Sequence, residues 1–307
     1  MVSRRVIARG QRPYPGVIAR GRRPRSNLAA SALSLGLVLF GVRTAPAQTM
    51  RDFEYARPYR GEQRLQASVE FAAGTLQLAA STVPLLYQLK LRYDTERFQP
   101  VGSYDPGTGT VHLGVTGSGR GGIRVEGKRA LAQTAAIEFS PSTALSLELS
   151  VGAADAALEL GGLRLAEFVL KSGASRTTVG FRQPNPGACH SAAVTSGAGE
   201  VSISQAGNSG CPIWYFDGGV GTVTLDLAGA WPANARIRLN LALGGVKLLA
   251  PKELGLRVMM GGFLAKFDAE RFTRSGRIYT SEGYLRATRR LDIEVSSALG
   301  GVSVEWR

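Results

Sequence analysis

The stretch Phe216-Asp-Gly-Gly-Val-Gly-Thr-Val-Thr-Leu225 indicates the fold most clearly, because similar stretches recur through the second half of the chain. Each copy has an entering strand, a Gly/Ala-rich step, and a second strand of alternating Val, Leu or Ile. The other copies are Leu149–Leu160, Leu170–Val179, Val194–Ile203, Leu239–Leu248 and Val295–Val304. The aligned anchors Gly152, Gly173, Gly197, Gly219 and Ala242 are spaced 21, 24, 22 and 23 residues apart. Repeats of this length are typical of stacked architectures.

One such unit cannot bury its apolar face alone, whereas a stack of units buries one continuous face. Glycine at the step tolerates backbone angles that other residues avoid and lets neighbouring coils approach closely. We therefore predict an all-β protein with a β-solenoid, or parallel β-helix-like, repeat array. An antiparallel β-sandwich with evenly spaced hairpins would give a similar pattern, and it stays the alternative.

The region before the repeats also has the period-two alternation of half-buried strands, most strictly in Tyr87–Tyr93. The best candidates for helices are Ala130–Glu138 and Leu163–Leu170, of which the second also fits a strand. We predict a small N-terminal β module over residues 48–140 and the β-repeat, solenoid-like domain over residues 141–307.

Residues 1–47 are typical of a secretory signal peptide. A basic region is followed by the apolar stretch Leu28–Val42, and then by Ala45-Pro46-Ala47, an A-x-A cleavage pattern. The apolar stretch is short for a membrane span, which needs about 20 residues. We predict cleavage before Gln48 and export to the periplasm, the cell surface or the medium. An uncleaved N-terminal anchor is the alternative.

The formal charge of the chain is +14, but its distribution argues against a nucleic-acid partner. Nine arginines and no acidic residue lie within residues 1–47, so the remainder carries only +5. A mildly basic mature chain needs no polyanionic partner. We predict no nucleic-acid binding, and no stable membrane span once the signal is removed.

The two cysteines, Cys189 and Cys211, favour a disulfide, because an exported protein meets an oxidising compartment. Two separate buried thiols are the alternative. A metal site is disfavoured, since only His190 lies beside the pair and zinc needs further ligands at suitable spacing.

Several patterns suggest chemistry but lack the context for it. Gly117, Gly119 and Gly122 fit G-x-G-x-x-G, yet a strand pattern follows where a dinucleotide site needs a helix. His112 and His190 have no accompanying nucleophile motif. The carboxylates that a carbohydrate-active enzyme would need to cluster are Asp155, Glu159, Glu200, Asp217 and Asp226. We predict no catalytic, cofactor-binding or metal-binding residue, and no enzyme.

A basic cluster lies near the C-terminus and could face anionic envelope polymers or lipid headgroups. It consists of Arg271, Arg274, Arg277, Arg286, Arg289 and Arg290. Ordinary surface charge near the C-terminal end is the explanation that we favour, and an anionic partner is the alternative.

Four motifs occur in an order that resembles one known family. They are Phe181-Arg-Gln-Pro-Asn-Pro186, Gly218-Gly-Val-Gly-Thr-Val-Thr-Leu-Asp-Leu-Ala-Gly-Ala-Trp231, Leu243-Gly-Gly-Val with Pro251 and Leu254-Gly-Leu-Arg-Val258, and Arg277-Ile-Tyr279 with the closing Leu291-Asp-Ile-Glu-Val. Over roughly residues 60–307 the chain is similar to the bacterial toast-rack family, described as adhesins of unknown function. The β-rich part of that family is related to cell-wall-antibiotic response proteins.

The resemblance implies a parallel β-helix-like fold and transfers no catalytic residue. The chain departs from the family between Pro186 and Pro212, where the cysteines bracket one repeat. We predict an exported, non-enzymatic, adhesin-like or structural protein, whose partner is a cell-surface or envelope protein or polysaccharide. An envelope-stress sensing module and a carbohydrate-active enzyme are the alternatives.

Overall fold

The computed structural model describes residues 49–118, 133–231, 234–261, 264–268 and 270–307. Within the chain, Pro46–Arg307 forms one compact unit. The predicted signal segment, Gly119 and Gly122 lie outside the described residues. The signal peptide, and the interpretation that the glycine motif is not a dinucleotide site, therefore stay predictions.

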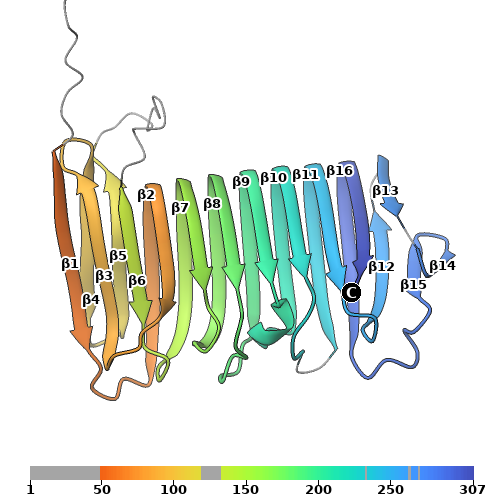
Figure 1. Ribbon diagram of the computed structural model, residues 1–307, viewed down its shortest axis with the longest axis horizontal. Helices are drawn as coiled ribbons and strands as arrows, with labels where there is room; N and C mark the ends of the chain where they lie inside the picture. The colour runs from red at the N-terminus through yellow and green to blue at the C-terminus, as the bar shows by residue number, and fades with distance from the viewer. Residues whose placement is uncertain (1–48, 119–132, 232–233, 262–263, 269) are drawn as a thin grey trace, which may run out of the picture. The chain divides into compact units, whose positions relative to one another are not determined.

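The described residues are almost entirely β-structure (Figure 1). The strands are β1 (Met50–Pro58), β2 (Arg64–Ala80), β3 (Leu85–Asp94), β4 (Phe98–Asp105), β5 (Thr110–Gly117), β6 (Thr134–Phe139), β7 (Ala144–Glu159), β8 (Arg164–Gly180), β9 (Ser191–Ser204), β10 (Ile213–Asp226), β11 (Ala235–Ala250), β12 (Gly255–Gly261), β13 (Leu264–Asp268), β14 (Phe272–Ser275), β15 (Ile278–Ser281) and β16 (Arg290–Trp306). One 3₁₀ turn, η2 (Ala206–Ser209), lies between β9 and β10.

The repeat strands lie side by side and parallel in the order β2, β7, β8, β9, β10, β11, β16 (Figure 1). Their pairing register follows the repeat found in the sequence, with Leu239 of β11 opposite Phe216 of β10 and Val295 of β16. Among the strands that the structure describes, antiparallel pairs occur only toward the two ends of the stack. The predicted parallel repeat array is confirmed, and the antiparallel sandwich is wrong for the repeats.

Each long strand must fold back on itself. The first residue of β7, Ala144, pairs with Arg164, the first residue of β8, and only four residues link the strands. Five residue steps span at most about 18 Å, whereas a straight strand of this length would be about 50 Å long. The strand therefore bends, and its two halves contribute to two layers, the first layer before the Gly step and the second layer after it.

The N-terminal end of the stack shows the two layers in contact. The first half of β2 pairs with β5, and the second half pairs with β6. β4 extends the first layer and β3 the second, and the rings of Tyr104 and Tyr87 meet between them with centroids 5.7 Å apart. Apolar side chains from both layers form a single core.

Glycine is required at the bend of the later coils. Gly199, Gly221, Gly244 and Gly300 stack in register with φ values of 151°, 154°, 152° and 148°. An added Cβ at each would lie between 1.8 and 2.0 Å from the carbonyl oxygen of the preceding coil. Only glycine therefore permits both this backbone conformation and the close approach of neighbouring coils.

The last strand in sequence is not the last in the stack. β16 lies between β11 and the pair β12 and β13, with β12 on its first half and β13 on its second. At the other side of the repeats, β2 pairs with β7 over residues 64–78, so the sheet continues across residue 140. The division into an N-terminal module and a repeat domain stays a prediction about organisation.

Candidate interaction surface

The outward side chains of the two layers form ladders of alternating charge. Arg176 of β8 lies between Asp155 of β7 and Glu200 of β9, with N–O distances of 3.9 and 3.3 Å. On the other layer, Arg238 pairs with Glu294 at 2.8 Å. Because like charges on adjacent strands repel, the alternation keeps stacked coils compatible. Exposed pairs of this kind contribute little stability each.

Three large apolar side chains interrupt this polar exterior at the bend. Val220, Leu243 and Leu299 occupy one position of successive coils and are 56%, 44% and 47% exposed. Strand spacing places neighbours about 5 Å apart, so the three side chains form one continuous strip, the apolar ridge. The same position is alanine in β7, β8 and β9. Contiguous exposed apolar residues, unlike scattered ones, are typical of interaction sites.

A shallow hollow lies on each side of the apolar ridge. The hollow on the first layer is lined by polar side chains that include Thr195, Asp217 and Asn240. The Asn240 amide donates a hydrogen bond to Asp217 Oδ1 at 2.9 Å. The hollow on the second layer is open because Gly245 and Gly301 carry no side chains, and Lys247 also lines it. An apolar strip between polar hollows could bind a partner with directional hydrogen bonds as well as apolar contact.

The return loops at the opposite edge of the coils are cross-linked. The predicted disulfide between Cys189 and Cys211 is confirmed, with the Cα atoms 4.6 Å apart. Each cysteine lies three residues before the registered pair Ala192 and Trp214, so the bond joins equivalent positions of consecutive coils. Both side chains are buried, which makes the bond a structural clamp with no exposed thiol.

Asn185 explains the Pro-Asn-Pro motif in physical terms. Its amide nitrogen donates to the carbonyls of Leu165 and Ser209 at 2.9 and 2.8 Å, and its oxygen accepts from the Leu165 N–H at 3.1 Å. Asn208 acts similarly in the next loop, donating to the Phe181 carbonyl at 2.9 Å. Since these backbone groups lack strand partners, the two amides satisfy hydrogen bonds that would otherwise be lost.

Of the carboxylates considered for glycoside chemistry, Asp155 and Glu200 lie on either side of Arg176, and the other three make different contacts. Asp155 and Glu200 belong to the charge ladder of the second layer, and Asp217 faces outward from the first. Glu159 and Asp226 instead accept hydrogen bonds from backbone N–H groups of the return loops. A glycosidase needs two carboxylates flanking one bond. Asp155 and Glu200 instead flank the Arg176 guanidinium, with which both form ion pairs.

The two histidines are separate and exposed. His112 lies on β5, and the ring of His190 contacts the Ala166 carbonyl at 3.1 Å. Within the described ranges, His, Cys, Asp and Glu form no group of three suited to a metal ion. The same part of the chain has no helix that could cross a bilayer.

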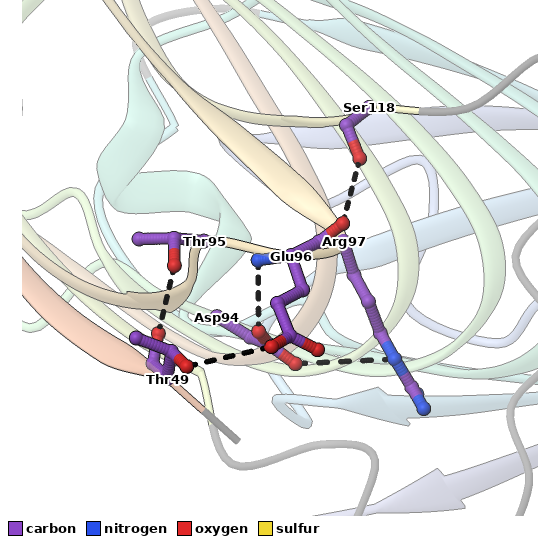
Figure 2. Close-up of polar contacts among 6 residues, drawn as sticks. All are labelled: Thr49, Asp94, Thr95, Glu96, Arg97 and Ser118. Carbon is purple, nitrogen blue, oxygen red and sulfur yellow. Dashed lines mark hydrogen bonds and ion pairs between the residues drawn. The ribbon is translucent and has the colours of Figure 1, made fainter. Parts of the chain in front are cut away.

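A polar cluster at the N-terminal end is structural (Figure 2). Thr95 donates to the Thr49 carbonyl at 3.1 Å, and the Glu96 N–H donates to Asp94 Oδ1 at 3.0 Å. The Ser118 hydroxyl donates to the Glu96 carbonyl at 3.3 Å. These bonds join the start of β1, the turn between β3 and β4, and the end of β5. The Asp94 carboxylate therefore helps to close this end of the fold.

Sequence reasoning missed the apolar ridge. Strict alternation from Leu239 through Leu241 predicts that Leu243 also faces the core, but the bend turns it outward. The sequence did contain one signal for the ridge, the glycine that follows each ridge residue. This glycine marks the point where the alternation of inward and outward side chains shifts by one residue.

Comparisons with known proteins found one family model and several solved structures. A family model described as "N-terminal domain of toast_rack, DUF2154" matches residues 45–204, which are 160 of the 307. A proposed cell adhesion protein from Clostridium sporogenes ATCC 15579 is 15% identical, with a TM-score of 0.47 over 84% of this chain and 100% of its own. A proposed adhesin from Bacteroides fragilis NCTC 9343 is 12% identical, with a TM-score of 0.40 over 85% and 99%. No curated protein matches.

Proposed function

This chain belongs to the toast-rack family, and on that premise we propose that it is an exported, non-enzymatic, adhesin-like protein that contacts its partner through the apolar ridge. The observation that carries the proposal is the registered exposure of Val220, Leu243 and Leu299 on three adjacent coils. The protein has a large apolar core, so a lack of room in the interior does not explain why these side chains are exposed. Contact with a partner explains their exposure better.

Export is supported by the signal-like segment of the sequence and by the buried disulfide. Structural disulfides form and persist in oxidising compartments and are rare in the cytosol. The rigid, stacked architecture with cross-linked loops suits a protein that presents a fixed surface outside the cell. A partner of the cell surface or envelope, protein or polysaccharide, fits the combination of an apolar strip and polar hollows.

The test is an adhesion assay with purified protein coated on a surface. The cells are those of the source bacterium with the gene for this protein deleted. We expect a surface coated with the wild-type protein to retain them. The ridge variant Val220→Ser/Leu243→Ser/Leu299→Ser should retain them at least about tenfold less, because about half of each apolar side chain would be buried on binding. Folding of the variant is checked by its melting temperature.

The matched control changes three side chains on the outer face of the second layer. Thr178→Ala/Ser202→Ala/Thr224→Ala alters three coils without touching the ridge or the two hollows, and it should bind as the wild type does. Equal retention by the ridge variant and the wild type, or no retention above an albumin coat, would refute the proposed role of the ridge.

A further inference from the structure

Positive charge is concentrated at one end of the stack. The C-terminal cap, residues 270–290, contains six arginines and two glutamates, a net charge of +4. All other residues that the structure describes comprise 18 basic and 20 acidic side chains, a sum of −2. The basic character of the described chain therefore belongs to the cap.

The cap is a hairpin followed by a short loop. β15 pairs with β12, and β14 pairs with β15, so the hairpin extends the first layer beyond the last coil (Figure 1). The loop 282–289 then leads back to β16. The Gly255 N–H donates to the Arg289 carbonyl at 3.1 Å, and the Met260 N–H donates to the Arg277 carbonyl at 2.9 Å. Both ends of β12 are thus tied to the cap.

Tyr284 anchors the loop. Its hydroxyl donates to Asp292 Oδ1 at 2.9 Å, and the guanidinium groups of Arg257 and Arg290 lie 5.2 and 5.5 Å from its ring centroid. Burial, followed by the hydrogen bond to Asp292, raises the pKa of Tyr284, so the phenol stays protonated at neutral pH. The anchored ring holds the following residue in a fixed position.

That residue, Leu285, is the most exposed of the large apolar side chains in the described structure, at 82%. It stands on a turn closed by hydrogen bonds from the N–H groups of Arg286 and Ala287 to the Gly283 carbonyl, both 3.0 Å. Ile278 of β15 is also exposed, beside the exposed Met259 of β12. Apolar tips next to arginines are typical of surfaces that bind at a membrane interface.

Three of the six arginines remain available for a ligand. Arg277, Arg286 and Arg289 are exposed, and their side chains make no ion pair or hydrogen bond with any residue the structure describes. Arg271, in contrast, lies 3.8 Å from Glu282. Unpaired guanidinium groups bind phosphate oxygens with two parallel hydrogen bonds.

We propose that the C-terminal cap binds the surface of a membrane that contains anionic lipids, with Leu285 inserted at the headgroup boundary and Arg277, Arg286 and Arg289 on lipid phosphates. Charge complementarity selects an anionic surface. The exposed Leu285 favours a membrane over a soluble polyanion, because only the acyl chains of a membrane would bury this side chain. The cap is separate from the apolar ridge, so membrane binding would leave the ridge free.

The experiment is co-sedimentation of the purified chain with phosphatidylcholine vesicles, with and without about one-third phosphatidylglycerol. The protein should bind only the anionic vesicles, and the binding should weaken with added salt. Arg286→Gln/Arg289→Gln should lower the partition coefficient by about fivefold per arginine. Leu285→Ser should lower it by about tenfold, the ratio expected for losing a buried leucine side chain.

The matched controls make the same chemical changes at the opposite end of the stack. Arg60→Gln/Arg92→Gln removes two exposed arginines, and Val83→Ser replaces a side chain that is 49% exposed. Both should bind as the wild type does. Absence of binding to anionic vesicles, equal effects of cap and control variants, or undiminished binding of Leu285→Ser would each overturn the proposal, the last in favour of a soluble polyanion. The adhesion assay for the ridge gives an independent readout.

Discussion

Replacing Gly244 by alanine should destabilise the fold far more than the same change at its neighbour. Gly244 has a φ of 152°, and an added Cβ would lie 1.9 Å from the Gly221 carbonyl oxygen and 3.0 Å from the Gly221 carbonyl carbon. At Gly245 the φ is not positive, and the nearest atom to an added Cβ is the Gly301 carbonyl oxygen at 3.9 Å. The two positions therefore differ in backbone strain and in space while sharing one strand.

The expected magnitude follows from these two effects. A non-glycine residue in this backbone region costs about 1–3 kcal/mol. Relieving an approach of 1.9 Å requires neighbouring coils to separate, which at an overpacked site costs about another 1–3 kcal/mol. Gly244→Ala should therefore lose about 2–6 kcal/mol, and Gly245→Ala should change stability by less than about 1 kcal/mol, because alanine only restricts the unfolded chain there.

Thermal unfolding followed by far-UV circular dichroism measures the difference. For a unit of this size about 2–4 °C of melting temperature corresponds to each kcal/mol, so Gly244→Ala should melt roughly 5–20 °C lower. Gly245→Ala should melt within a few degrees of the wild type. Equal melting temperatures for the two variants would show that the coils do not approach each other through their glycines, and would refute the bent-coil packing.

Three further outcomes are expected. Changing both cysteines to serine should lower the free energy of unfolding by about 3 kcal/mol, the value of the chain-entropy model for a sequence separation of 22. Urea unfolding measures this loss, and an unchanged midpoint would contradict the stabilising role of the disulfide. Asn185→Ala leaves loop backbone groups unpaired and should lower the free energy of unfolding by about 2–4 kcal/mol. The control Asn240→Ala, at an exposed position, should lower it by less than about 1 kcal/mol, and similar losses for the two variants would contradict the role of the Asn185 amide. The hydrogen bond from Lys247 lowers the pKa of Glu305, so the pair stabilises the fold above the ordinary carboxyl pKa and stops doing so as the pH falls through the lowered value. Lys247→Met should accordingly melt below the wild type at neutral pH and together with it in strong acid, and a difference that persists in acid would contradict this linkage.

The architecture of the repeats could be predicted because the sequence carries the register directly. Gly197 and Gly219, aligned from the sequence alone, lie on adjacent coils, where an added Cβ at Gly219 would lie 2.4 Å from the Gly197 carbonyl oxygen. The disulfide was predicted from the oxidising compartment that an exported protein meets. The structure adds that its cysteines occupy equivalent places in consecutive coils.

Other features depend on tertiary contacts, which the repeat in the sequence does not reveal. Residues 134–138 of the candidate helix Ala130–Glu138 form part of strand β6, because pairing with β2 and β3 overrides the helix propensity of alanine. The place of β16 between β11 and β12 was also not predictable, since the repeat specifies which strands are equivalent and not their order in the stack.

The candidate site was the least predictable part. Val220 and Leu299 continue apolar strand patterns in the sequence, and the structure shows that the bend turns them outward. The basic cluster was visible in sequence, but the exposure of Leu285 beside it, which suggests a membrane, required the anchored loop.

The proposed export and the disulfide between coils together predict the form in which the cell produces this molecule. Protein isolated from its source should be fractionated, and its N-terminus and its Cys189–Cys211 peptide should be analysed by mass spectrometry without reduction. We expect a chain outside the cytoplasm that begins at Gln48 and yields the two cysteine peptides as one linked species. A cytoplasmic chain that begins at Met1 and contains two free thiols would contradict both the export and the clamped fold.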